Sequence, residues 1–154
     1  MKKISNKDNS RIIEKLEEIN PLFAGMWKSF EPMAFDENAE SAELEIINNN
    51  FRIVANPSFW KRSGETKKIF IICHEMCHVL FGHWLINSKL DREWSNIAQD
   101  IVVNEYLSTM FNEKCIGKDI ANIKTVFKNK SDIVEVRFDY MYYYKLLIQC
   151  LKPS

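Results

Sequence analysis

The residues best suited to chemistry in this chain lie in the sequence His74-Glu75-Met76-Cys77-His78. An α-helix turns by about 100° per residue, so His74 and His78 lie one turn apart on the same helix face. Two imidazoles with this spacing can bind one zinc ion, and Glu75 can act as general base for a zinc-activated water. All three histidines of the 154-residue chain fall in this short region, the third being His83. The pattern predicts a zinc site that hydrolyses a substrate.

The motif lies inside an apolar run from Ile71 to Gly82, which is typical of a buried helix. The alternative is a core helix in which the histidines only pack. Burying two imidazoles and a carboxylate without a partner costs free energy, which favours metal binding. Cys73 and Cys77 are also one turn apart, but they point about 100° away from the histidine face. We therefore expect the two cysteines to be small packing residues.

A catalytic zinc ion usually has three protein ligands, so a third ligand is expected beyond the motif. His83 lies about 140° around the helix from His78, and it could bind the same ion only if the helix broke at Gly82. The next helix is predicted to carry Asp100 on its buried face, where a carboxylate needs a partner. We predict Asp100 as the third ligand and Glu93, on the same face, as the alternative third ligand. Asp100 could instead orient a ligand histidine.

Other polar residues near these positions are weaker candidates. Asn96 and Asn104 could support the site from the helix that carries Asp100, and His83 could support it from the end of the motif helix. A group that stabilises the developing oxyanion is also needed, and the candidates are His83, Tyr106 and Tyr140.

Hydrophobic periodicity and turn residues predict the elements that hold these side chains. Asp91 is expected to cap the helix that follows the motif. The predicted fold is α+β and zincin-like, with a small sheet or hairpin packed against the motif helix and the helix with the third ligand. The expected helices are residues 6–19, 22–35, 65–84, 92–110 and 140–151; the strands are 42–47, 51–55 and 133–136; residues 111–132 are expected to be mainly loop.

Composition narrows the class of protein. The length predicts one domain over residues 1–154, and 46% hydrophobic with 27% charged residues is ordinary for a globular protein. The formal net charge of zero gives no general attraction to nucleic acid or to an anionic membrane. No apolar run is long enough to span a bilayer, and the first residues lack the apolar core of a signal peptide. The four cysteines do not form a disulfide pattern, so we expect a cytoplasmic protein.

Three stretches of the chain together resemble a known family. They are Ala55-Asn56-Pro57-Ser58-Phe59, the motif from His74 to His83, and Trp94-Ser95-Asn96-Ile97-Ala98-Gln99-Asp100. In this order they resemble the metallopeptidase-like domain that often precedes a von Willebrand A-like domain in bacterial and phage proteins. The resemblance covers about residues 20 to 107. The chain has no room for the A-like domain before it ends at Ser154, so we expect that any role of that domain is either absent or supplied by a separate partner protein.

The resemblance implies zinc at His74 and His78, Glu75 as the catalytic base, and the Asp100 position as the third ligand. It also implies that His83 is a recurrent feature that supports the site. The resulting hypothesis is a zinc-dependent metallopeptidase that acts on a peptide or protein substrate. Two alternatives stay open: a catalytically inactive zinc-bearing binding or accessory protein, and a non-peptidase zinc amidohydrolase with the same ligands.

Overall fold

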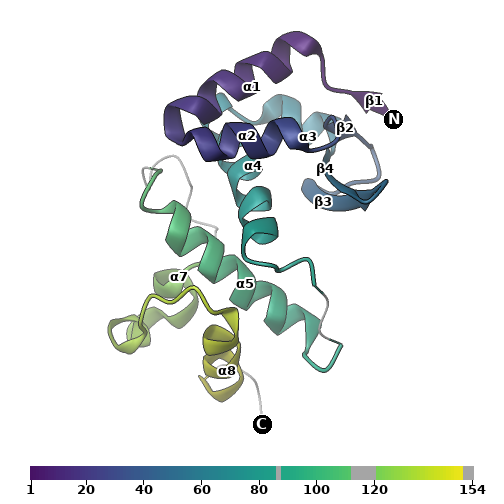
Figure 1. Cartoon of the computed structure of the whole chain (residues 1–154). Helices are drawn as coiled ribbons and strands as arrows, with labels where there is room; N and C mark the ends of the chain where they lie inside the picture. Colours follow the sequence, from purple (N-terminus) through teal and green to yellow (C-terminus); the bar gives the residue numbers. More distant parts are fainter. Residues whose placement is uncertain (86–87, 112–120, 151–154) are drawn as a thin grey trace. The chain divides into compact units, whose positions relative to one another are not determined.

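The structure is a computed structural model that describes residues 1–85, 88–111 and 121–150. Its fold is α+β, as predicted, with several helices and a small mixed sheet of four strands (Figure 1). The chain forms two compact units, residues 1–76 and 77–154, and the boundary falls inside helix α4. The single domain and the zincin-like arrangement of helices and sheet stay predictions.

The N-terminal unit contains two helices that pack against each other, α1 (Asn6–Ile19) and α2 (Pro21–Ser29) (Figure 1). Helix α1 has the bounds predicted from its periodicity, and Ile12 and Leu16, one turn apart, are its buried residues. Asn20 separates the two helices. Its backbone N–H closes α1 on the carbonyl of Leu16, and its side chain accepts a hydrogen bond from Leu22 N at 3.0 Å to cap α2.

Helix α2 ends at Ser29, so the predicted helix over residues 22–35 is wrong in its second half. Pro32 explains the difference, because a proline disfavours helical backbone in the residue before it. Glu31 instead donates its N–H to the carbonyl of Phe51 at 2.9 Å. The chain then continues into the short strand β2 (Ala34–Phe35).

The sheet has the strand order β1-β2-β4-β3, where β1 is Lys2–Lys3, β3 is Ala42–Ile47 and β4 is Asn50–Ala55. Strand β2 pairs antiparallel with β1 and parallel with β4, while β3 and β4 form the predicted antiparallel hairpin. Asn48 and Asn49 have φ values of 53° and 58°, the left-handed conformation that a tight hairpin turn requires and that asparagine tolerates. Strand β3 is an edge strand.

Two helices follow the sheet. Asn56 and Pro57 end β4, as predicted, but they also begin the short helix α3 (Pro57–Arg62), which the sequence analysis did not predict. The Asn56 side chain accepts a hydrogen bond from Phe59 N at 3.0 Å, and Pro57 occupies the first turn, where its missing N–H costs nothing. The motif helix α4 (Glu65–Leu80) starts where expected and ends four residues before the predicted Trp84.

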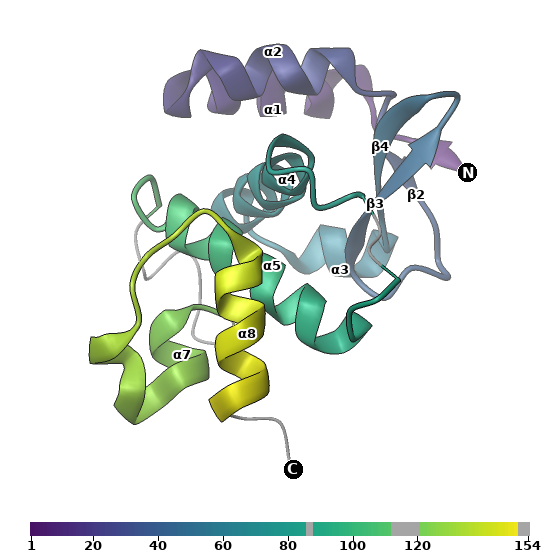
Figure 2. The same ribbon diagram turned by 60° about the horizontal axis from the view of Figure 1, so that its bottom comes forward.

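The C-terminal unit is helical and is built around α5 (Arg92–Leu107), which packs against α8 (Tyr140–Cys150) (Figure 2). Asp91 caps α5 as predicted, accepting a hydrogen bond from Trp94 N at 3.1 Å. Helix α5 ends at Leu107 and not at Met110, because Ser108 and Thr109 bond back to carbonyls of the last turn. The buried core of this unit consists of Ala98, Ile101, Val102, Ile123, Phe127, Tyr143 and Leu147.

The segment predicted to be mainly loop contains more regular structure than expected. Helix α7 (Ile123–Phe127) lies in it and the 3₁₀ helix η1 (Lys128–Ile133) begins in it, while residues 112–120 are outside the described residues. Asn122 and Thr125 form a reciprocal capping box at the start of α7, with Thr125 N donating to Asn122 Oδ1 at 2.8 Å. Ile123 and Phe127 are the apolar contacts that bury this short helix in the core.

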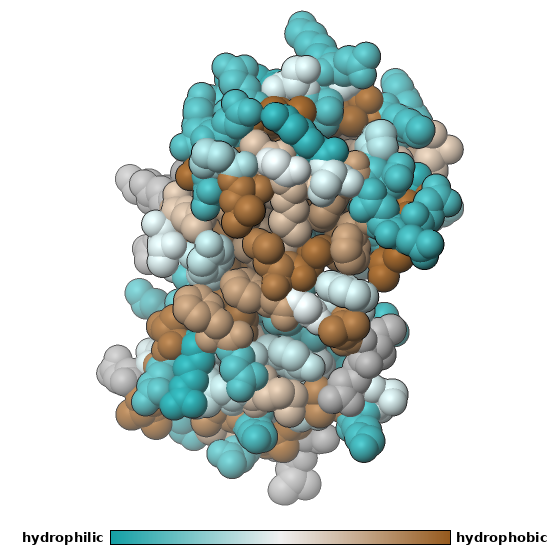
Figure 3. Space-filling view, in the orientation of Figure 1, coloured by the Kyte–Doolittle hydropathy of each residue, from teal (hydrophilic) through white to brown (hydrophobic). Residues whose placement is uncertain are grey.

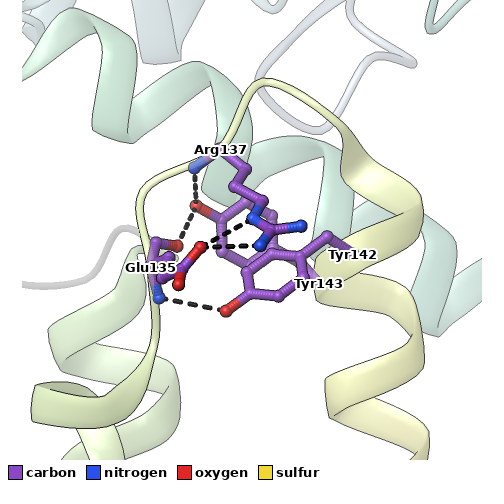
Figure 4. Close-up of polar contacts among 4 residues, drawn as sticks. All are labelled: Glu135, Arg137, Tyr142 and Tyr143. Atoms are coloured by element: carbon purple, nitrogen blue, oxygen red, sulfur yellow. Dashed lines mark hydrogen bonds and ion pairs between the residues drawn. The ribbon is translucent and has the colours of Figure 1, made fainter.

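The strand predicted at residues 133–136 is wrong, because tyrosines of α8 bind the backbone that a neighbouring strand would bind (Figure 4). Tyr142 Oη accepts a hydrogen bond from Glu135 N at 3.0 Å, and Tyr143 Oη accepts one from Arg137 N at 2.8 Å. Tyr143 also donates to the carbonyl of Glu135 at 3.0 Å. The Arg137 guanidinium lies 4.3 Å from the centre of the Tyr142 ring and pairs with the Glu135 carboxylate. We call these four residues the tyrosine clamp.

Replacing Tyr143 with Phe is expected to lower the free energy of unfolding by about 1–2 kcal/mol, because two backbone groups lose a buried partner. The matched variant Tyr142→Phe loses one hydrogen bond and keeps the ring under Arg137, so its loss should be smaller. Urea unfolding of both variants measures the difference. Equal stability of Tyr143→Phe and the parent protein would contradict the role of the clamp.

The pH dependence of stability gives a second measurement on the same variant. Burial is the main cause that raises the pKa of Tyr143 above its ordinary value. Its contribution to stability is therefore complete below the ordinary tyrosine pKa of about 10, and it is lost as the pH rises through the higher folded value. Tyr143→Phe should remove this part of the alkaline loss of stability.

The surface gives one further observation. In Figure 3, mainly hydrophilic residues cover helix α1, in keeping with its many exposed charged side chains. Within the described residues, no helix combines the length and the apolar character needed to cross a bilayer.

Candidate metal site

Helix α4 carries both histidines of the motif. His74 and His78 are four residues apart in one continuous helix, so their side chains leave the same face one turn from each other. The helix forms because residues flanking the histidines bury another face; Ile72, Cys73, Met76 and Cys77 are each fully buried. The two histidines are only partly buried.

Asp100 is held beside His78 by helix α5. Its Oδ1 atom lies 3.1 Å from Nε2 of His78. The sequence predicted that Asp100 would lie on the buried face of α5. Its side chain is 41% exposed, so it lies instead at the edge of that face. The carboxylate therefore reaches His78 without bearing the full cost of burial.

Three side chains meet the requirements of a metal site. One ligand atom from each of His74, His78 and Asp100 lies within 4.8 Å of the other two. Ligand atoms at about 2.0–2.1 Å from a tetrahedral zinc are separated by about 3.3 Å, so the 3.1 Å between His78 and Asp100 is suitable for a shared ion. Two imidazoles with one carboxylate are also a known donor set of catalytic zinc, which leaves a fourth position open. The residues present fit a zinc ion.

The end of α4 brings the third histidine back to the motif. Gly82 has a φ of 71°, a conformation that glycine adopts without strain. Gly82 N donates to the carbonyl of Val79 at 3.1 Å, and His83 N donates to the carbonyl of His78 at 2.8 Å. These two bonds are the Schellman pattern of a helix C-terminus. As a result, Nδ1 of His83 lies 2.9 Å from Nδ1 of His78.

The break at Gly82 is the condition under which sequence reasoning allowed His83 to approach the site. The 140° separation calculated for an unbroken helix does not apply, because the helix ends at Leu80. His83 contacts Nδ1 of His78, whereas the other nitrogen of that ring, Nε2, faces Asp100. His83 therefore lies behind a candidate ligand and not among the candidate ligands. A glycine two residues after the last apolar helical position was the signal that could have predicted this turn.

Aromatic side chains of the C-terminal unit surround His83, which is 8% exposed. The Tyr140 ring meets it edge-on with centroids 5.3 Å apart, and the Phe81 ring lies at 5.8 Å. Phe81 in turn stacks on Phe138, at 6.0 Å with 11° between the planes, and Tyr106 meets both rings nearly at right angles. Sequence reasoning missed Phe81 and Phe138, because their proximity depends on the path of residues 134–139.

The remaining predicted residues lie as follows. Glu75 is partly buried on α4 next to His74. Glu93 and Asn96 are exposed, and Glu93 is seven residues before Asp100, about 10 Å along the axis of α5. Within the described residues, the group that could hold a metal includes Asp100 and not Glu93. Asn104 is 3% exposed and donates its side-chain amide to the carbonyl of Ala121 at 2.8 Å.

The cysteines of the motif helix behave as the sequence predicted. Within the part of the chain that the structure describes, neither Cys73 nor Cys77 forms a disulfide bond, and both are completely buried. Burial raises the pKa of the Cys77 thiol to about 12, so it stays protonated near neutral pH. A protonated, buried thiol is a packing group and a poor metal ligand.

The N-terminal unit contains a cleft of about 820 Å³ that is separate from the candidate metal site. Its lining includes Phe35, Trp60 and the ion pair of Arg11 and Glu65, whose atoms lie 2.8 Å apart. None of the residues predicted from the sequence to act on a substrate or metal lines it.

Comparison with known proteins identifies the family of this chain. Residues 5–131 match the model of a family described as "putative metallopeptidase domain". The chain belongs to this family. The matched range includes the motif helix and Asp100, so the family resemblance seen in the sequence is confirmed. No curated protein and no solved structure matches the chain.

Proposed function

We propose that this metallopeptidase-family chain is a zinc-dependent peptidase in which His74, His78 and Asp100 hold the ion. The observation that carries the proposal is the proximity of two imidazoles and a carboxylate, whose ligand atoms lie within 4.8 Å of one another. The family match supports a metal-dependent peptidase, and the nitrogen and oxygen donors favour zinc among the common ions.

Zinc in such a site supplies Lewis acidity, which polarises a substrate carbonyl and lowers the pKa of a water molecule. Each protein side chain then has a definite task. His74 and His78 present neutral nitrogens from one helix face, and Asp100 contributes the negative charge that offsets part of the charge of the ion. Glu75, next to His74 on the same helix, takes the proton from the attacking water and delivers it to the leaving amine.

The peptide bond is the proposed substrate, because the family is described as a "putative metallopeptidase domain". Two histidines with one carboxylate are also a donor set that zinc peptidases use. A non-peptidase amidohydrolase would use the same ligands, and only assays against peptides and simple amides separate the two activities. A zinc-bearing binding protein would retain the metal without hydrolysing either kind of substrate.

The first experiment is metal analysis by mass spectrometry of the protein purified without a histidine tag. We expect about one zinc per chain, which should be lost in His78→Ala because a ligand is removed. The protein should also be stripped with a chelator and reloaded with Zn²⁺ before analysis. A parent protein that holds no zinc after reloading would rule out the metal site and with it the peptidase.

A further inference from the structure

His78 and His83 make two contacts, one between their backbones and one between their side chains. The Schellman turn joins their backbones at 2.8 Å, and the side-chain nitrogens Nδ1 and Nδ1 face each other at 2.9 Å. Two ring nitrogens at this distance must share a proton, since one has to donate and the other has to accept. The tautomers of His78 and His83 are therefore coupled.

The other nitrogen of His78 decides the direction of this hydrogen bond. Nε2 of His78 faces Oδ1 of Asp100 at 3.1 Å, so Nε2 is the nitrogen that an ion shared with Asp100 would use. A ligating nitrogen must offer its lone pair, which places the remaining proton on Nδ1 of His78. Nδ1 of His83 is then the acceptor.

We propose that His83 is a positioning residue for the metal site, which accepts the Nδ1–H hydrogen bond of His78 and so fixes the tautomer and ring orientation of that ligand. This inference rests on the proposed zinc site. Hydrogen bonds of this kind orient metal-bound histidines and increase their basicity, and their loss typically weakens metal binding about 10–100-fold.

The orientation of His83 is itself held by its surroundings. Its ring is buried and contacts the rings of Phe81 and Tyr140, so water has little access to replace the hydrogen bond. Tyr140 starts helix α8, directly after the segment that the tyrosine clamp binds to that helix (Figure 4). A rigid acceptor costs less entropy to order than a mobile one, which suits a residue that positions a ligand.

The test compares zinc affinities of His83→Phe and His83→Asn with that of the parent protein, by competition with a chelator that reports free Zn²⁺. Phe keeps a planar ring but has no acceptor. Asn has a carbonyl oxygen at the same number of bonds from the backbone as Nδ1. We expect about 10–100-fold weaker binding for His83→Phe and an affinity close to that of the parent for His83→Asn.

A second measurement uses the unaltered protein, so its result does not depend on whether the variants fold. The chain has three histidines, so ¹⁵N-edited NMR can assign every imidazole signal. In the zinc-loaded protein, the proton on Nδ1 of His78 should be hydrogen-bonded and should exchange slowly with water. The same proton should exchange quickly in His83→Phe.

The outcomes separate this inference from the proposed function. If the parent protein binds zinc and His83→Phe binds it equally tightly, the positioning role is wrong and the zinc site stands. Rapid exchange of the Nδ1 proton of His78 in the zinc-loaded parent would likewise overturn the role of His83. A parent protein that takes up no zinc would overturn both.

Discussion

Replacing Glu75 with Gln is expected to abolish peptide hydrolysis while zinc remains bound. The amide has nearly the shape of the carboxylate but cannot take a proton from water, and general-base catalysis typically contributes about 10²–10⁴-fold in rate. Glu75 is not among the proposed ligands, so the metal content should stay near that of the parent protein. The measurement is turnover of a peptide substrate by zinc-loaded protein, together with metal analysis of the same sample.

The same substitution in the first turn of α4 supplies the control. Glu65 is exposed and pairs with Arg11 at 2.8 Å, so Glu65→Gln removes a surface ion pair and leaves the motif intact. We expect this variant to retain both zinc and turnover. Full activity of Glu75→Gln would show that Glu75 is not the base. If the parent protein also fails to hydrolyse peptides and simple amides while zinc is bound, the binding-protein alternative would be favoured.

Replacing Asp100 with Ala is expected to give the largest loss of zinc affinity outside the histidine motif. Zinc sites with four ligands bind with about 10–16 kcal/mol, or about 3 kcal/mol per ligand, so loss of one ligand corresponds to about 100-fold weaker binding or more. The Asp100 side chain is partly exposed, so its removal should disturb the core little. Chelator competition measures the affinity, and thermal unfolding of the metal-free protein checks that the fold is retained.

Glu93→Ala is the matched control, since it removes a carboxylate from the same helix. Glu93 is exposed in the first turn of α5, and its loss should leave zinc affinity unchanged. The opposite result, with weak binding in Glu93→Ala and normal binding in Asp100→Ala, would transfer the third ligand to Glu93. Equal losses in both variants would contradict a single carboxylate ligand.

Much of the fold follows from local signals in the sequence. The bounds of α1 and the start of α5 were predictable because Ser5 and Asp91 cap helices whose apolar residues have helical spacing. The Asn-rich turn predicted the β3–β4 hairpin, because asparagine is one of the few residues that tolerate positive φ. Predictions failed at α3 and α7, where a short helix is stabilised by its cap and its contacts and not by a long periodic pattern.

The wrong prediction of a strand at residues 133–136 shows a second limit of prediction from local sequence. Its β-branched residues favour an extended backbone, and the backbone after Ile133 is extended. Whether an extended segment becomes a strand depends on which groups bind its N–H and C=O groups. Here the hydroxyls of Tyr142 and Tyr143 bind them, and no local pattern reveals such partners.

For the candidate site, the sequence by itself determined the spacing of His74 and His78, because four residues make one helical turn wherever that helix lies. The placement of Nε2 of His78 beside Asp100, and of Nδ1 beside His83, was decided only by tertiary structure. The first contact requires a separate helix, α5, which begins only at Arg92, to bring Asp100 to His78 at the end of α4. The second requires the turn at Gly82. Helix periodicity carries no information about either, because it describes directions around one axis and not where that axis ends or what it meets.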